Sequence, residues 1–193
     1  MGRVVWLRRE ADRDGYRNDR TLGMWPIGRG SDSGPGEPVA SPLDATFEDL
    51  FRRHYSAIRF LVNTYTEPGL GVVLAGPNDL EGTCWFEALA DEANPLILGR
   101  HSSAEMFVPG DPTLSLRHLA VVVHARRGPG PVKFRILDLR TASGFQDEQG
   151  RKLEALECQG PLLVRSASLA ILLFPKGEGT VDWPSEPSEA WAR

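Results

Sequence analysis

Apolar side chains recur every three or four residues between Thr46 and Tyr65, and charged side chains stand mostly between them. This spacing places the apolar side chains on one face of an α-helix. Asp44 is expected to cap the helix N-terminus, and Pro68 is expected to end the element. Because the apolar face is wide, we expect the helix to pack on the following domain or on a second copy of the chain. The members of this face are Phe47, Leu50, Phe51, Tyr55, Ile58, Leu61, Val62 and Tyr65.

After Pro68 the pattern changes to short apolar runs that are separated by turn-forming residues. From Val132 to Ile136 apolar and polar residues alternate strictly, which is typical of a strand with one face in water. Many short strands with little helix between them predict an all-β fold, a β-sandwich of short antiparallel strands. The runs are Val72–Leu74, Cys84–Leu89, Leu96–Leu98, Met106–Val108, Leu119–His124, Val132–Leu137, Leu153–Leu156, Leu162–Val164 and Leu169–Phe174.

The two ends of the chain lack this patterning. Residues 1–42 combine scattered Arg and Asp with a stretch rich in Gly, Ser and Pro. They are predicted to be disordered, because they cannot bury enough apolar surface to offset the entropy of ordering. The expected organisation is a disordered segment over 1–42, an amphipathic helix and linker over 43–68, a β-sandwich domain over 69–175 and a mostly disordered tail over 176–193.

Composition and charge exclude several classes of protein. The chain has 193 residues and a formal net charge of −4, which argues against nonspecific nucleic-acid binding, because such binding requires a basic surface. Its cysteines, Cys84 and Cys158, are too few and too isolated for a zinc site or a disulfide framework. No apolar run approaches the roughly 18 residues of a membrane-spanning helix, and the N-terminus lacks the apolar core of a signal peptide. We expect a cytoplasmic protein with no cofactor and no nucleic-acid or membrane partner.

Candidate chemistry lies at the ends of two predicted strands. The run Leu96–Leu98 leads directly into Gly99-Arg100, and Ser115 stands three residues before His118, just ahead of the next run. An arginine offers several N–H donors in a planar fork, and a serine hydroxyl adds a short donor beside it. An arginine and a hydroxyl on strand-borne loops therefore indicate recognition of a phosphate dianion.

This spacing resembles the forkhead-associated (FHA) domain, a phosphothreonine-peptide reader. The signature of that family is Gly-Arg at a strand end, then Ser-x-x-His, then a turn near Asn-Gly, and the third element here would be the segment 138–144. The resemblance covers roughly Gly71 to Phe174. It implies an FHA-like β-sandwich whose loops grip the ligand at one end. The implied partner is a protein or peptide that carries phosphothreonine, such as a Ser/Thr kinase or its substrate.

The resemblance implies roles for the residues of the first two elements. Arg100 corresponds to the arginine that contacts the phosphate, and Gly99 to the glycine that lets the backbone turn at the strand end. Ser115 corresponds to the second phosphate contact, through its hydroxyl. His118 corresponds to a structural histidine that holds the loop by hydrogen bonds. Arg117 is expected to reach the phosphate or an acidic side chain of the ligand, and a solvated arginine is equally compatible with the sequence.

The third element departs from the family pattern, which usually has Ser/Thr-Asn-Gly. This chain has Ala142-Ser143-Gly144. Ser143 stands where the asparagine of the family contacts the ligand main chain, and Gly144 keeps the structural glycine. Ala142 lacks a hydroxyl that often joins the phosphate contacts. Arg140 stands where the family often has glycine, and we expect it to supply positive charge from a new direction.

The sequence leaves two functions open. The first is a non-catalytic phosphothreonine-peptide binding module in Ser/Thr kinase signalling, which the intact Gly99-Arg100 and Ser115 favour. The alternative is a constitutive protein–protein interaction or scaffold domain of the same fold that has lost phosphopeptide binding and docks through the helix at 46–65. The altered loop at 142–144 favours this alternative. Nothing in the sequence supports an enzyme.

Overall fold

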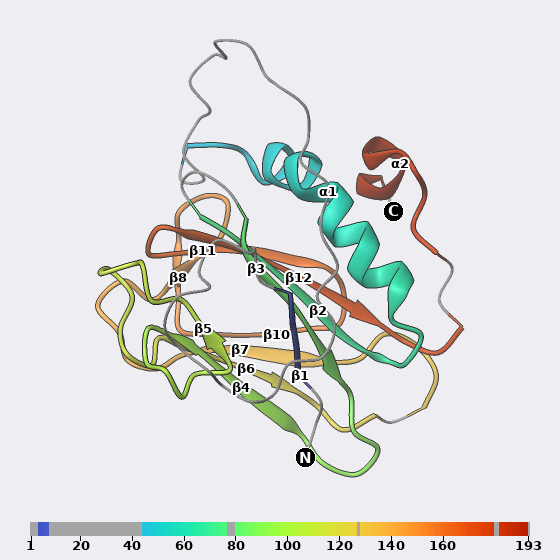
Figure 1. Cartoon of the computed structure of the whole chain (residues 1–193), viewed down its shortest axis with the longest axis horizontal. Coiled ribbons are helices and arrows are strands. Elements are labelled where there is room, and N and C mark those ends of the chain that lie inside the picture. The colour runs from blue at the N-terminus through green and yellow to red at the C-terminus, as the bar shows by residue number, and fades with distance from the viewer. Residues whose placement is uncertain (1–3, 8–43, 77–79, 127, 180–181, 193) are drawn as a thin grey trace.

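The computed structural model describes residues 4–7, 44–76, 80–126, 128–179 and 182–192, and it shows two packed β-sheets (Figure 1). The strand pairs are antiparallel except for β4 with β5. The predicted β-sandwich of short antiparallel strands is therefore confirmed. In spatial order the first sheet has β1 (Val4–Leu7), β3 (Leu80–Glu87), β2 (Gly69–Ala75), β12 (Leu169–Lys176), β11 (Leu162–Ser166), β8 (Phe145–Gln146) and β9 (Lys152–Leu153). The second sheet has β10 (Ala155–Cys158), β7 (Phe134–Asp138), β6 (Leu119–Val123), β4 (Asn94–Gly99) and β5 (Met106–Phe107).

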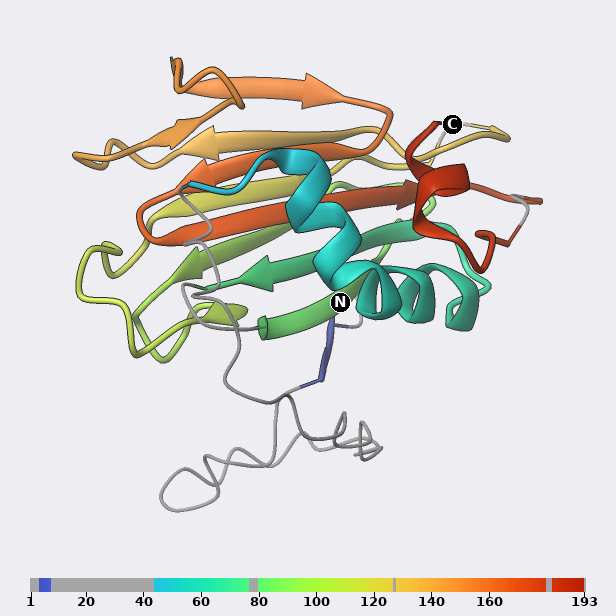
Figure 2. The same ribbon diagram turned by 90° about the horizontal axis from the view of Figure 1, so that it is seen from above.

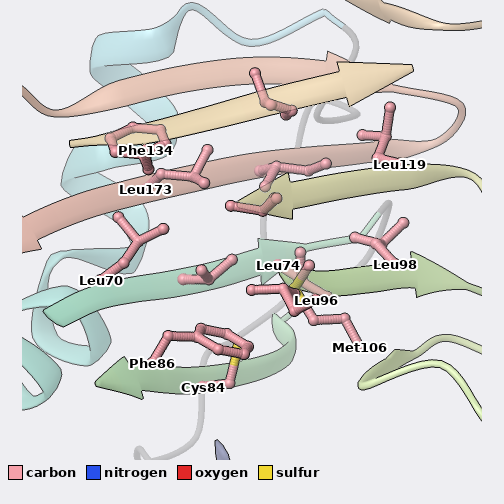
Figure 3. Close-up of a cluster of buried hydrophobic side chains, with 14 of the residues drawn as sticks. Leu70, Leu74, Cys84, Phe86, Leu96, Leu98, Met106, Leu119, Phe134 and Leu173 are labelled. Carbon is pink, nitrogen blue, oxygen red and sulfur yellow. The ribbon is translucent and has the colours of Figure 1, made fainter. Parts of the chain in front are cut away.

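The main core lies between the two sheets, and strands of both sheets contribute to it (Figure 3). Strand β7 shows the expected pattern, since Phe134 and Ile136 are buried in this core while Arg135 between them is exposed. Leu96 and Leu98 of β4 are completely buried in the same core. Burying a leucine side chain contributes roughly 1.5–3 kcal/mol. The core thus fixes the strand that leads into the candidate site.

Helix α1 (Phe47–Thr64) lies across the outer face of the first sheet (Figure 2). Its N-cap is Thr46, whose hydroxyl accepts a hydrogen bond from the Asp49 N–H at 3.1 Å. The Asp49 carboxylate accepts one from the Thr46 N–H at 3.3 Å, which completes a capping box. The predicted cap at Asp44 is wrong, because the chain at Thr46 offers this reciprocal pair and the helix begins one residue later.

The apolar face of α1 forms a second core with the outer face of the first sheet. Phe51 and Ile58 of the helix belong to the same cluster as Val73 of β2 and Leu172 of β12. The ammonium of Lys176 donates to the Val62 carbonyl at 2.6 Å, near the end of the helix where carbonyls lack partners within it. The helix therefore packs on the following domain, which is one of the two partners expected from the sequence.

The C-terminal residues 182–192 also pack on α1, and they include the short helix α2 (Pro187–Trp191). Trp183 and Ala190 pack with the second core, and the Trp183 N–H donates to Asn63 Oδ1 at 2.9 Å. The Trp183 ring stands edge-on to Phe174, with 5.2 Å between ring centroids. The prediction of a mostly disordered tail is wrong for these residues, because aromatic packing and hydrogen bonds hold them on the helix.

Strand β1 pairs with β3 and falls within the segment that the sequence predicted to be disordered. The rest of that prediction, residues 1–3 and 8–42, lies outside the described residues. Within the described ranges, no helix combines the length and the apolar character that crossing a membrane requires.

Candidate binding site

Three loops meet at one end of the sandwich. Strand pairing places Leu98 of β4 beside Leu119 of β6, and Leu119 beside Asp138 of β7. Because both pairs are antiparallel, the end of β4, the start of β6 and the end of β7 lie at the same end of the second sheet. All of the site residues expected from the sequence lie on the loops at this end or at the strand ends beside them. The loops are residues 100–105, 108–118 and 139–144, and the first two are the yellow-green segments at the left of Figure 1.

Gly99 lies directly against the loop that carries Ser115. The Arg100 N–H donates to the Ser115 carbonyl at 3.2 Å, and the His101 N–H donates to the Leu116 carbonyl at 3.1 Å. A side chain at position 99 would place its Cβ 2.3 Å from the Leu116 carbonyl oxygen. The resemblance gave Gly99 a role in turning the backbone, and the structure adds a steric role, because only glycine allows the two loops to approach this closely.

The Arg100 side chain is exposed but is held at one point. Its Nε donates to the Leu114 carbonyl at 2.8 Å. None of the ion pairs within the described ranges involves Arg100, so its two terminal nitrogens remain available to a ligand. Ser115 is half-buried beside it, and no described residue forms a hydrogen bond with the Ser115 hydroxyl. The site therefore offers a pre-positioned guanidinium fork and a hydroxyl, which are the donors that a phosphate needs.

His118 is completely buried and joins two of the loops. Its Nδ1 accepts a hydrogen bond from the Ser115 N–H at 3.0 Å. Because a backbone N–H only donates, the proton of the neutral ring is on Nε2, which lies 3.4 Å from the Gly144 carbonyl and 3.3 Å from Ser143 Oγ. Both ring nitrogens thus lie within hydrogen-bonding distance of groups on these two loops.

The burial of His118 gives the fold a pH dependence. Burial lowers the pKa of His118 below its ordinary value of 6.5, although the Gly144 carbonyl and the carboxylates of Asp138 and Asp111 act in the opposite direction. The folded state favours the neutral ring, so this contribution to stability is complete above about pH 6.5 and is lost as the pH falls through the lowered pKa. We expect the free energy of unfolding, measured with denaturant, to fall as the pH is lowered below about 6.5, and to fall less in a His118→Gln variant. If the free energy of unfolding depended on pH equally in the wild-type chain and in His118→Gln, His118 would not be the source of the pH dependence.

The loop that positions Arg100 is itself held by the buried carboxylate of Asp111. This carboxylate accepts hydrogen bonds from Thr113 and from Ser168 of the turn between β11 and β12. Burial raises the pKa of Asp111, but these hydrogen bonds outweigh burial, so the net pKa lies below its ordinary value. Asp111 therefore stays charged at neutral pH and ties the loop to the first sheet. Sequence reasoning missed this residue. Its one signal in the sequence is its place in the turn-forming segment 109–112.

The third loop is organised by Asp138 and Thr141. The Thr141 hydroxyl donates to Asp138 Oδ1 at 2.6 Å, and the Gly144 N–H donates to Thr141 Oγ1 at 3.0 Å. Gly144 has a φ of 61°, in the left-handed region that favours glycine, and its carbonyl accepts from the Ser166 hydroxyl at 2.7 Å. Sequence reasoning missed Asp138, Thr141 and Ser166 as organisers of the loop. An aspartate followed by a threonine before a glycine is a turn signal that would have pointed to the first two.

Ser143, which the resemblance aligns with the asparagine of the family, is half-buried on the third loop. Its hydroxyl oxygen lies near the protonated Nε2 of His118, at 3.3 Å. A hydroxyl that accepts from the ring still has its own proton to donate to a ligand. The neighbouring Ala142 contributes its carbonyl, which accepts from the Lys152 ammonium at 3.0 Å. This lysine adds a positive charge at the edge of the third loop.

Arg117 and Arg140 are exposed, and neither forms an ion pair with an acid in the described ranges. Direct hydrogen bonds connect the other site residues except Gly99, whereas these two arginines share only the loops with them. Arg140 has a φ of 62°, which is unusual for a residue other than glycine. The left-handed conformation costs roughly 1–2 kcal/mol for an ordinary residue. The only other described residue besides glycine with a positive φ is Ala167, in the turn between β11 and β12.

Two substitutions of Arg140 distinguish the effect of its charge from the effect of its strained backbone. We expect Arg140→Gly to leave the free energy of unfolding unchanged or to raise it by up to about 1 kcal/mol, because glycine relieves the strained φ. The phosphopeptide hypothesis drawn from the sequence predicts that the same change weakens peptide binding about threefold to tenfold. Arg140→Ala is the matched variant, since it removes the charge and keeps the strain. Urea unfolding and fluorescence anisotropy measure the two effects, and full binding by both variants would exclude a contact from Arg140.

No protein-family model and no curated protein matches the sequence. Solved structures do match the fold. The FHA domain of the CT664 protein from Chlamydia trachomatis is 20% identical over 57% of this chain and all of that chain, with a TM-score of 0.43. A structure from an analysis of phosphothreonine-dependent FHA domain interactions is 20% identical over 54% of this chain and 95% of that one, with a TM-score of 0.38.

A third match is EmbR from Mycobacterium tuberculosis in complex with a low-affinity phosphopeptide. It is 15% identical over 66% of this chain and 31% of that one, with a TM-score of 0.40. The chain resembles forkhead-associated domains. At these identities and TM-scores the likeness concerns the fold, so the function has to be argued from the loops of this chain.

Proposed function

We propose that this chain is a non-catalytic module that binds phosphothreonine peptides in Ser/Thr kinase signalling. One observation carries the proposal. The guanidinium of Arg100 is fixed through Nε by the carbonyl of Leu114, the residue before Ser115, and its two terminal nitrogens take part in no ion pair among the described residues. A fixed fork of this kind suits a phosphate dianion, because it donates two parallel hydrogen bonds without losing further side-chain freedom.

The remaining charges at this end support the same ligand. Arg117, Arg140 and Lys152 lie on or beside the same loops and are exposed. Their attraction for a phosphate extends over about 8–10 Å at physiological salt, so they add to association although the whole chain is acidic. The choice of phosphothreonine over phosphoserine rests on the resemblance to FHA domains and on the phosphothreonine-dependent interactions named for one of the matched structures.

A triad of Ser115, His118 and Asp138 has no geometric support. A serine hydrolase needs an unprotonated histidine nitrogen facing the serine hydroxyl. Here His118 Nδ1 accepts from the backbone N–H of Ser115, and the Asp138 carboxylate holds Thr141. The His118 nitrogen beside the Ser143 hydroxyl is Nε2, which carries the ring proton. Among the described residues, no group of His, Cys, Asp or Glu side chains is arranged to hold a metal ion.

The alternative function is a scaffold domain that has lost phosphopeptide binding, and the third loop favours it. Ser143 is shorter than asparagine, and its oxygen already lies beside the His118 ring. The scaffold hypothesis also relied on α1 as a docking surface. The apolar face of that helix is buried in the second core, and Phe60 is its one large apolar side chain that is exposed. This observation weakens the alternative.

Binding of the whole chain to a degenerate phosphothreonine peptide library tests the proposal. Fluorescence anisotropy is measured beside the unphosphorylated library and beside matched phosphoserine and phosphotyrosine libraries. We expect saturable binding in the micromolar range that requires the phosphate and is strongest for phosphothreonine. Protein shown to be folded that fails to bind at hundreds of micromolar would contradict the proposal and favour the scaffold.

A further inference from the structure

One side of α1 binds the backbone of the C-terminal segment, residues 182–192 (Figure 1). Arg59 Nε and Asn63 Nδ2 donate to the Trp183 carbonyl at 3.3 Å and 3.2 Å, and Asn63 Oδ1 accepts from the Trp183 N–H at 2.9 Å. The Tyr55 hydroxyl donates to the next carbonyl of the segment at 2.7 Å. These three side chains stand four residues apart, so they form one row along the helix.

Two tryptophans of the segment pack on aromatic side chains. The Trp183 ring is stacked on Tyr55 and stands edge-on to Phe174, with 6.2 Å and 5.2 Å between ring centroids. The centroid of the Trp191 ring lies 5.1 Å from that of Phe51. Aromatic anchors combined with hydrogen bonds to a peptide backbone are typical of surfaces that bind extended segments. The α1 surface consists of Phe51, Tyr55, Arg59, Asn63 and Phe174.

The charges on the two sides of this contact are complementary. Asp182, Glu186 and Glu189 of the segment are exposed. Arg52 and Arg59 are exposed on the same side of α1, two turns apart, and Arg52 also forms an ion pair within its own helix. The helix therefore attracts a segment that is acidic as well as aromatic.

The C-terminal segment has little structure of its own. Helix α2 has five residues, and the Glu186 side chain at its N-cap makes no capping hydrogen bond. Helices this short are not stable alone in water. Ala190 is the one residue of 182–192 that is buried, whereas Ile58 of α1 is completely buried in the contact with the first sheet. Release of the segment is therefore a local opening that leaves α1 packed on the sheet.

We propose that the α1 surface is a docking site for an acidic, extended segment of a partner protein in which tryptophan is followed by proline. Residues 182–192 fill this site from within the same chain, and the partner segment displaces them. The contacts of Trp183 and Pro184 show the chemistry that the site accepts. Because the site is filled in the free chain, α1 docks a partner only after release of the segment. The inference is independent of the phosphopeptide site, which lies on the loops at one end of the sandwich.

The test uses the full chain and a fluorescent peptide with the sequence of residues 182–192. The double variant Trp183→Ala/Trp191→Ala keeps the α1 surface and removes both aromatic anchors of the internal segment. We expect the peptide to bind this variant in the micromolar range and the wild-type chain about tenfold more weakly, because the internal segment occupies the site. A peptide that carries the same two substitutions should not bind. Circular dichroism shows whether the variant is folded.

Asn63→Ala, added to the double variant, removes both hydrogen bonds to the backbone of the docked peptide. We expect it to weaken binding about tenfold. Thr64→Ala is the matched control, because Thr64 is an exposed neighbour on α1 that forms no described hydrogen bond with the segment. This control should leave the affinity for the peptide unchanged.

A measurement on the wild-type chain avoids any effect of the substitutions on folding. Excess unlabelled peptide is expected to shift the ¹⁵N amide signals of Trp183 and Ala190 in the labelled chain as the internal segment is displaced. Unmoved signals, or no binding by the folded double variant at hundreds of micromolar, would overturn the proposal. A wild-type dimer in light scattering that the double variant abolishes would also overturn it, because the occupant would then be the segment of a second copy.

Discussion

Replacing Gly99 by alanine is expected to lower the free energy of unfolding by about 2–3 kcal/mol and to reduce phosphopeptide binding more than tenfold. The new Cβ would lie 2.3 Å from the Leu116 carbonyl oxygen and 3.0 Å from the Arg117 Cα. Both are backbone atoms, so the loop itself has to move. That movement breaks the hydrogen bonds that the Arg100 and His101 N–H groups donate to the Ser115 and Leu116 carbonyls. Urea unfolding and anisotropy measure the two losses.

Gly110→Ala is the matched control for this change. Gly110 lies on the loop between β5 and β6 at the same end of the sandwich, and a Cβ there would meet nothing within 4 Å. The same substitution should therefore leave stability and binding nearly unchanged. A Gly99→Ala variant as stable as Gly110→Ala would contradict the close packing of the two loops.

Replacing Arg100 by alanine is expected to reduce phosphopeptide affinity about 100-fold or more, with little change in stability. Two charge-assisted hydrogen bonds to the phosphate are lost, and each contributes roughly 1.5–3 kcal/mol. The side chain is exposed and holds the fold only through its Nε bond to the Leu114 carbonyl. The affinity of Arg100→Lys should lie between those of the wild-type chain and Arg100→Ala, because lysine keeps the charge and lacks the guanidinium fork.

Arg135→Ala controls for the loss of one positive charge. Arg135 is exposed on β7, within the second sheet and away from the binding loops. We expect this variant to bind within about twofold of the wild-type chain. Equal affinities for Arg100→Ala and Arg135→Ala, measured by anisotropy in the same buffer, would exclude Arg100 as the phosphate contact.

The main elements of the fold follow from local patterns in the sequence. Apolar spacing predicted a helix from Thr46 to Tyr65, and the helix covers Phe47–Thr64. The alternation at 132–136 gave a strand with the expected inner and outer faces. These patterns succeed because periodicity reports which face of an element is buried. The N-cap was placed at Asp44 and not at Thr46 because these two residues stand close together in the sequence. Which of them caps the helix depends on the reciprocal hydrogen bonds between Thr46 and Asp49.

Other features depend on contacts between residues that are far apart in the sequence. The tail is rich in polar residues and proline, yet Trp183 is held by Asn63 and Phe174. The loops of the candidate site are likewise held by contacts that the sequence does not reveal, such as the one between Asp111 and Ser168. Composition cannot reveal these partners, because each becomes meaningful only when the sheets bring the segments together.

The candidate site, too, was predicted only in part from the sequence. The Gly-Arg and Ser-x-x-His spacing identified the first two loops, and the structure places them side by side. The spacing did not reveal that Thr141 and Asp138 hold the third loop, or that Arg140 adopts a left-handed conformation. Hydrogen bonds of the loops and backbone angles determine these features, and a motif of a few residues contains neither.

The most direct test of the central claim is a titration of the ¹⁵N-labelled full chain with one phosphothreonine peptide and its unphosphorylated counterpart, followed by NMR. The phosphorylated peptide is predicted to shift the amides of residues 100–101, 115–118 and 141–144 together with the Arg100 Nε–H signal, while the unphosphorylated peptide shifts none of them. Phosphate-independent shifts, or shifts confined to α1 and α2, would contradict a phosphopeptide site at this end of the sandwich.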